Sequence, residues 1–205
     1  MTANSESDAE RLLAALPVIA ADTNARLHAR LVAKAERDGV LDIAYRTLDS
    51  PVGTLLVAAT GQGLLRVAYA REDHDSVLAM LAGAVSPRIL RAPHRLDEVS
   101  RQIDEYFRRE RTAFDVPLDF RLSTGFRRNV LAHLPRITYG STQSYAQVAA
   151  AAGSPKAVRA VGTACATNPL PVVVPCHRVV RSDGSSGGYV GGTEAKRTLL
   201  TLEAA

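Results

Sequence analysis

The sequence predicts an α/β protein in two parts: an amino-terminal sheet with helices and a carboxy-terminal, mostly helical domain. Strand-like runs between turn signals fill residues 42–69, and two short helical patterns meet near residue 153. With 205 residues, 46% of them hydrophobic, the chain can bury a core in one mid-sized domain or two small ones. We expect an extension over residues 1–40, an α/β domain over 41–119 and a carboxy-terminal domain over 120–205.

The extension reads as two helices, residues 8–16 and 22–38. Each begins with an aspartate, and Gly39 is a stop signal for the second. Apolar residues in the second helix fall on one face, as in a helix that packs against something else. We therefore interpret the extension as a packing or partner element and not as a chemical one.

Residues 41–119 carry the signals of a sheet with helices. Three alternating or apolar segments predict a meander of strands, namely residues 42–48, 54–59 and 64–69. Helical patterns follow over residues 75–81 and 96–109, and the proline-containing residues 87–93 between them read as a linker.

The carboxy-terminal part carries a helix-turn-helix pattern. A helix over residues 124–134 is followed by a short helix over 145–152 that Gly153 ends. Ser154 and the proline after it then cap a second short helix over residues 156–166. Alanine and glycine leave this second helix almost no side-chain bulk, which suits close approach to a narrow groove of DNA.

Composition favours a cytoplasmic protein without a membrane segment. No apolar run approaches the ~20 residues of a membrane span, and residues 1–10 are too polar for a signal peptide. The only cysteines, Cys165 and Cys176, cannot form a four-cysteine zinc site. We expect Cys165 to be an inert thiol packed in a helix, and no metal or cofactor.

The positive charge is concentrated in the second half. Residues 1–100 hold 11 basic against 13 acidic residues, and residues 101–205 hold 14 against 8. Between residues 120 and 182 there is no acidic residue but there are eight basic ones: Arg121, Arg127, Arg128, Arg136, Lys156, Arg159, Arg178 and Arg181. Such a stretch is either a solvated basic face or a surface for a phosphate backbone. The helix-turn-helix pattern favours DNA.

Cys176 is the best candidate nucleophile, because His177 follows it directly. Taken alone, this dipeptide favours a buried structural cysteine. The glycine-rich residues 182–192 that follow reverse the balance, because they let backbone approach a flat ligand closely.

Four motifs in order resemble the O6-alkylguanine-DNA alkyltransferases, also called methylated-DNA–protein-cysteine methyltransferases. They are Arg-Ala-Val-Gly from residue 159, Asn-Pro from 168, Pro-Cys-His-Arg-Val from 175 and Gly-Gly-Tyr-Val-Gly-Gly from 187. The likeness is strong over residues 124–203 and looser over 44–120. The resemblance implies a ribonuclease H-like amino-terminal domain, a winged helix-turn-helix domain and binding of the minor groove.

The resemblance also implies the reaction and its residues. An O6-alkylguanine is flipped out of double-stranded DNA, and its alkyl group passes irreversibly to the thiolate of Cys176, once per protein molecule. O4-methylthymine is expected as a second substrate, and the protein is expected to act as a monomer. Glu203, His177 and a water form a relay to the thiol, Asn168 is a hinge, and Tyr145 donates to the guanine ring.

For DNA and the substrate pocket, the resemblance implies two further sets of residues. Arg159 is the finger that replaces the flipped base, and the other DNA-binding residues are Lys156, Ala160, Gly162, Arg127, Arg128 and Tyr145. The substrate pocket is formed by Pro171, Val174, Tyr189, Val190 and Gly191. Backbone groups of Val174, Cys176 and Val190 are expected to read the guanine edge. Arg178 is expected to tie the backbone of the site together or to contact phosphate.

The chain departs from the family's sequence pattern in two motifs, and two rival functions stay open. Arginines follow Phe126 where family members usually have glutamine, no tryptophan is present, and Val190 replaces a more usual serine. One rival is a binding-only relative, but such proteins lack the cysteine. The other is a Cys-His hydrolase of another class, which would turn over repeatedly.

Overall fold

The computed structural model describes residues 21–204 of a chain that divides into two compact units, residues 1–40 and 41–205. In the first unit, helix α2 (Ala21–Arg37) confirms the predicted helix over 22–38. The helix ends at Arg37, and Gly39, two residues later, has a φ of 64° that fits a left-handed helix stop. The helix predicted over residues 8–16 lies outside the described residues.

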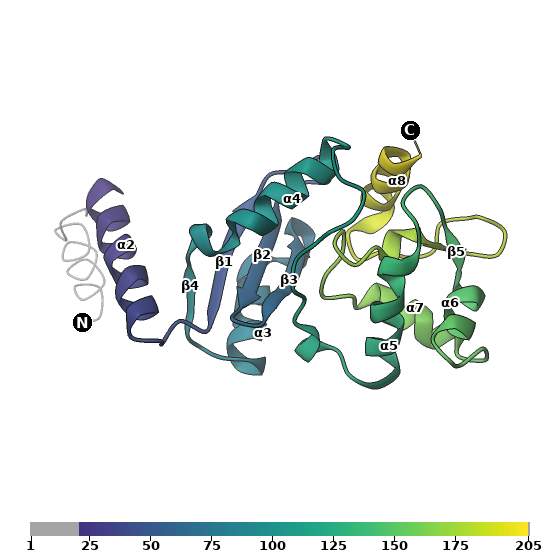
Figure 1. Cartoon of the computed structure of the whole chain (residues 1–205), viewed down its shortest axis with the longest axis horizontal. Helices are drawn as coiled ribbons and strands as arrows, with labels where there is room; N and C mark the ends of the chain where they lie inside the picture. Colours follow the sequence, from purple (N-terminus) through teal and green to yellow (C-terminus); the bar gives the residue numbers. More distant parts are fainter. Residues whose placement is uncertain (1–20, 205) are drawn as a thin grey trace, which may run out of the picture. The chain divides into compact units, whose positions relative to one another are not determined.

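The second unit begins with the predicted meander of strands (Figure 1). Strands β1 (Ile43–Leu48), β2 (Leu55–Thr60) and β3 (Gly63–Tyr69) pair antiparallel in sequence. A fourth strand, β4 (Ile89–Arg91), pairs parallel with β1, so the sheet order is β3-β2-β1-β4. The linker expected over residues 87–93 is therefore wrong in part. Three residues between two prolines carry no strand periodicity, and the tertiary pairing alone makes them a strand.

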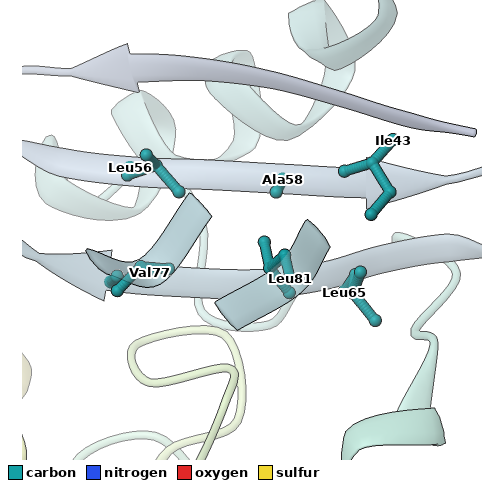
Figure 2. Close-up of a cluster of buried hydrophobic side chains, with 7 residues drawn as sticks. Ile43, Leu56, Ala58, Leu65, Val77 and Leu81 are labelled. Atoms are coloured by element: carbon teal, nitrogen blue, oxygen red, sulfur yellow. The ribbon is translucent and has the colours of Figure 1, made fainter. Parts of the chain in front are cut away.

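Both faces of the sheet are buried. Helix α3 (His74–Ala84) covers one face, and Figure 2 shows Val77 and Leu81 beside Leu56 and Ala58 of β2. Val57, between the last two, points to the opposite face and is also fully buried. Helix α4 (Asp97–Phe107) buries its own apolar stripe.

The segment that joins the two parts runs along the outer edge of β3. Leu64 N donates to Pro117 O and Leu64 O accepts from Asp119 N, both at 2.8 Å. Further along the same strand, Val67 N donates to Pro169 O at 2.8 Å. The outer edge of the sheet is thereby covered by other segments of the chain, whose backbone hydrogen bonds satisfy the N–H and C=O groups of β3.

The carboxy-terminal part is helical, as predicted. Its helices are α5 (Gly125–His133), α6 (Tyr145–Ala151), α7 (Val158–Ala166) and α8 (Gly192–Glu203). Ser144 and Gln147 form a capping box at the start of α6. Helices α6 and α7 pack together, and α5 packs against α7.

The predicted start of the second helix in this motif is wrong. Helix α7 begins at Val158, with Ala157 as its N-cap residue, and not at residue 156 behind Ser154. Ala157 N donates to Ser154 O at 2.9 Å, so Ser154 opens a separate turn before the helix. A proline at residue 155 fits the first position of that turn as well as the first position of a helix.

Two very short strands connect the helix-turn-helix motif to the cysteine segment. Strand β5 (Gln143–Ser144) pairs parallel with β6 (Val179–Val180), which directly follows the turn Cys176–Arg178. The sequence had shown neither strand. Between residues 21 and 204, no helix is both long enough and apolar enough to cross a membrane.

Candidate active site

Cys176 begins a short 3₁₀ turn, Cys176–Arg178, within the fully buried residues 168–180. The apolar residues before it form a tight turn in which Val174 N donates to Leu170 O at 2.7 Å. Val172 within this turn has a φ of 71°, a conformation that costs a β-branched residue roughly 1–3 kcal/mol. The thiol is therefore presented by a strained and closely packed segment.

Asn168 holds this segment with all three of its side-chain hydrogen bonds. Its Nδ2 donates to Cys176 Sγ at 3.1 Å and to Val174 O at 2.8 Å, and its Oδ1 accepts from Leu170 N at 3.0 Å. The amide is fully buried. It thus connects the backbone turn directly to the sulfur atom.

His177 and Glu203 form a buried pair behind the thiol. Their Nε2 and Oε1 atoms lie 2.8 Å apart. Burial would raise the pKa of Glu203, but hydrogen bonds from His177 and Arg178 outweigh it and lower that pKa to about 2. The ionised carboxylate can only accept, so His177 Nε2 carries the proton.

The other ring nitrogen of His177 then keeps its lone pair. Burial lowers the pKa of His177, although Glu203 opposes this shift, so we assign the neutral imidazole at pH 7. Within the described residues its buried Nδ1 has no hydrogen-bond partner. This tautomer can accept a proton at Nδ1.

Arg178 and Tyr106 complete the surroundings of the carboxylate. Arg178 donates from Nε and Nη2 to the two oxygens of Glu203, at 2.8 and 2.9 Å, and from Nη1 to Ile137 O at 2.6 Å. Tyr106 of α4 donates to Glu203 Oε1 at 2.7 Å. Arg178 therefore ties the backbone of the site together, one of the two roles expected for it.

Lys196 is a cation buried close to the thiol. It is fully buried, and its Nζ donates to Val179 O at 2.6 Å. Burial raises the pKa of the Cys176 thiol to about 11, while the Asn168 hydrogen bond and the charge of Lys196 oppose the rise. The resting cysteine is thus a neutral thiol that needs a base to become a nucleophile.

Three of the five expected pocket residues, Tyr189, Val190 and Gly191, belong to the glycine-rich loop, residues 182–192. The hydroxyl of Tyr145 contacts Gly187 so closely that any side chain there would collide with it. Burial raises the pKa of Tyr145, which keeps its hydroxyl a donor. Tyr189 is buried and its ring lies edge-on to that of His177, with centroids 6.4 Å apart.

The remaining pocket residues differ in exposure. Pro171 and Val174 are buried, and Val190 and Gly191 are half-buried. Val174 O accepts from both Asn168 and Cys176 N, and Cys176 O accepts from Val179 N. Two bonds already fill the lone pairs of Val174 O, so it must exchange a partner to read a base.

The outer face of α7 is as slim as expected. Val158, Arg159 and Ala160 are exposed, whereas Val161 and Ala164 pack inward with Cys165. The buried Cys165 accords with the inert thiol predicted there, and burial raises its pKa.

The other expected DNA-binding residues form a mixed set. Lys156 and Arg128 are exposed, and Gly162 is half-buried. Arg127 is also half-buried, and its guanidinium donates to Leu122 O. Arg127 therefore has a structural bond that the sequence did not indicate.

Sequence reasoning missed Lys196 and Tyr106. Lys196 shares the buried stripe of α8 with Leu199 and Glu203, at spacings of three and four residues, and a lysine in such a stripe is a usable signal. Tyr106 gave no such signal, because a tyrosine on an apolar helix face reads as ordinary core. Among residues 21–204, no cluster of three or more histidine, cysteine, aspartate or glutamate residues could hold a metal ion.

A buried thiol backed by a histidine–carboxylate pair, beside a helix-turn-helix motif, defines a protein whose cysteine chemistry takes place next to nucleic acid. Family models for 6-O-methylguanine DNA methyltransferase match two segments: the ribonuclease-like domain over residues 43–120 and the DNA-binding domain over 125–205. The chain belongs to this family of methylated-DNA–protein-cysteine methyltransferases.

Individual relatives agree with the family models. The constitutive methylated-DNA–protein-cysteine methyltransferase of Bacillus subtilis is 39% identical over 160 residues, which cover 78% of this chain and 94% of the relative. A crystal structure of the Mycobacterium tuberculosis O6-methylguanine methyltransferase is 38% identical, with a TM-score of 0.70 and coverage of 79% and 93%. The same organism's protein in complex with DNA gives a TM-score of 0.68 at 38% identity, with coverage of 78% and 92%.

Proposed function

We propose that this protein repairs O6-alkylguanine in DNA by transferring the alkyl group to Cys176, once and irreversibly. The observation that carries the proposal is the arrangement behind the thiol. Cys176 is held by Asn168, and His177 is fixed by an ionised Glu203 with Nδ1 free to accept a proton. Membership of the family supplies the substrate class.

The reaction follows from these groups. The thiol proton passes to His177 Nδ1 through a bridging water, and Glu203 stabilises the imidazolium that forms. The sulfur then attacks the alkyl carbon, so that an S–C bond forms as the C–O6 bond breaks. Tyr145 donates to the guanine ring as negative charge develops on it. No group in this arrangement can remove the alkyl group from the resulting thioether, so each protein molecule reacts once.

Double-stranded DNA is the partner, and alkyl transfer requires the target base to be flipped out. A thiolate buried in a turn cannot line up behind an alkyl carbon inside a stacked base pair. Arg159 is exposed on the slim face of α7, so its guanidinium can enter the duplex and take the place of the extruded guanine. Lys156 and Arg128 contact phosphates.

The proposal extends to a second substrate, to the oligomeric state and to the location of the protein. O4-methylthymine presents an alkyl group on a comparable exocyclic oxygen and is proposed as a second substrate. The protein acts as a monomer, because one chain supplies every group of the relay. Both cysteines are free thiols, and the reducing cytoplasm maintains that state.

A substrate titration tests this function against its nearest rival. An O6-methylguanine duplex is added in excess, and the repaired base is quantified over time. Repair should stop at one equivalent per protein molecule. Continued turnover would instead identify a Cys-His hydrolase, and tight binding without repair would identify a recognition protein.

A further inference from the structure

The edge of β3 contacts the segment that holds the cysteine. Val67 N donates to Pro169 O at 2.8 Å, and Arg66 Nη1 donates to Pro169 O at 3.2 Å and Asn168 O at 3.4 Å. Arg66 is itself buried and paired with Glu72. The amino-terminal sheet therefore fixes the backbone of the residue whose amide bonds the sulfur.

The last residue of β3 reaches the glycine-rich loop. The hydroxyls of Tyr69 and Tyr189 are 2.9 Å apart, and their rings meet edge to face with centroids 5.9 Å apart. Both side chains are buried, at 2% and 9% exposure. Each hydroxyl thus satisfies the other where water has little access, and losing one would leave a buried polar atom unpaired.

Gly191 packs directly against the same ring. A methyl group built at Gly191 would lie 2.5 Å from Cζ of Tyr69, well inside van der Waals contact. Gly188 in the same loop is different, because a methyl group there would meet no atom within 4 Å. Residue 191 must therefore be a glycine while the Tyr69 ring occupies this position.

We propose that Tyr69 is a positioning residue that fixes Tyr189 and so determines how large an O6 substituent the pocket accepts. The inference rests on the proposed function, and on the implication of the family resemblance that Tyr189 is a wall of the substrate pocket. A methyl group is too small to depend on that wall. A benzyl group must be oriented by it for the attack on its methylene carbon, and orientation controls rate.

A double-mutant cycle tests the link. Tyr69→Phe, Tyr189→Phe and the double variant react with two duplexes of the same sequence that contain O6-methylguanine or O6-benzylguanine. Tyr69→Phe should slow benzyl transfer about fivefold and methyl transfer less than about twofold. The double variant should be no slower than the slower single variant, because each change removes the same hydrogen bond.

Tyr45→Phe is the matched control. Tyr45 lies in strand β1 of the same sheet, where it packs against the hydrophobic core cluster, and the proposal gives it no role, so both rates should stay at the wild-type value. Thermal midpoints of all variants separate loss of folding from loss of positioning. Equal slowing of methyl and benzyl transfer at unchanged midpoint, or additive effects in the cycle, would overturn the inference. If the wild-type protein is alkylated by neither substrate, the proposed function itself would be refuted.

A steric pair provides a second route if a phenylalanine variant folds poorly. Gly191→Ala should slow benzyl transfer, whereas Gly188→Ala should not. Adding Tyr69→Leu to Gly191→Ala should restore benzyl transfer to the level of Tyr69→Leu alone, because the colliding ring has been removed. No restoration would show that Gly191 acts on the pocket without Tyr69, and the inference would fail.

Discussion

Tyr106 donates a hydrogen bond of 2.7 Å to Glu203, although the two residues are 97 positions apart in the sequence. The bond joins α4 of the sheet part to α8 of the helical part. Tyr106 also lies 3.5 Å from His177 Nε2, so it contacts both members of the buried pair. The buried pair of His177 and Glu203 is therefore supported from both parts of the unit.

Glu203→Gln should slow alkyl transfer at least about tenfold, corresponding to roughly 1.4 kcal/mol. A neutral amide cannot stabilise the imidazolium, so His177 becomes a weaker base and Cys176 reacts only at higher pH. Thiol reactivity measured against pH, together with DNA affinity, checks this. Glu194→Gln in the exposed first turn of the same helix is the control. An unchanged pH profile in Glu203→Gln would show that His177 acts without the carboxylate.

The carboxylate should also contribute to acid stability. The pKa of Glu203 is lowered from 4.5 to about 2 in the folded protein, so the unfolded chain binds more protons between these values. The contribution, on the order of 3 kcal/mol, is present above pH 4.5 and is lost as pH falls toward 2. Urea unfolding at several pH values checks this: wild type should exceed Glu203→Gln at neutral pH and approach it near pH 2. A constant difference would contradict the assignment.

Lys196→Met should raise the pKa of the Cys176 thiol, because the variant removes a positive charge that favours the thiolate. We expect the rate with free O6-benzylguanine to fall several-fold at neutral pH and to recover toward high pH. Lys34→Met, at an exposed position of α2, is the matched control. A uniform loss of rate at every pH would indicate that Lys196 only supports packing.

Arg159→Ala should impair repair in duplex DNA far more than reaction with the free base. Only the duplex requires unstacking, at a cost of a few kcal/mol, and only there does the finger stabilise the extruded state. Arg128→Ala should weaken DNA binding but leave the rate at saturating DNA unchanged. Equal losses on both substrates in Arg159→Ala would mean that Arg159 supports the pocket.

Local signals were sufficient for most elements of this fold. The three antiparallel strands and the helices follow from periodicity and from stop residues such as Gly39 and Gly153. Strand β4 could not be found in this way, because only its parallel pairing with β1 makes it a strand. The start of α7 was misplaced because the Ser154 turn uses the same residues as a helix cap.

The residues of the site likewise fall into those that the sequence could indicate and those that it could not. Cys176, His177, Asn168 and Glu203 were found from motifs and the family resemblance, and in the structure they form two hydrogen-bonded pairs, Asn168 with Cys176 and His177 with Glu203. Tyr69 could not be assigned a place in the site, because its contact with the glycine-rich loop depends on how the sheet meets the helical part. Contacts between residues that are far apart in the sequence produce no regular spacing from which they could be predicted.

The most direct test is the mass of the protein after reaction with an O6-methylguanine duplex. Wild type should gain one methyl group in place of the thiol proton, and peptide mapping should locate it on Cys176 and not on Cys165. Cys176→Ala should bind the duplex and gain nothing, because phosphate contacts carry most of the affinity. Methyl uptake by Cys176→Ala, or an unmodified wild-type protein after complete repair, would contradict the account.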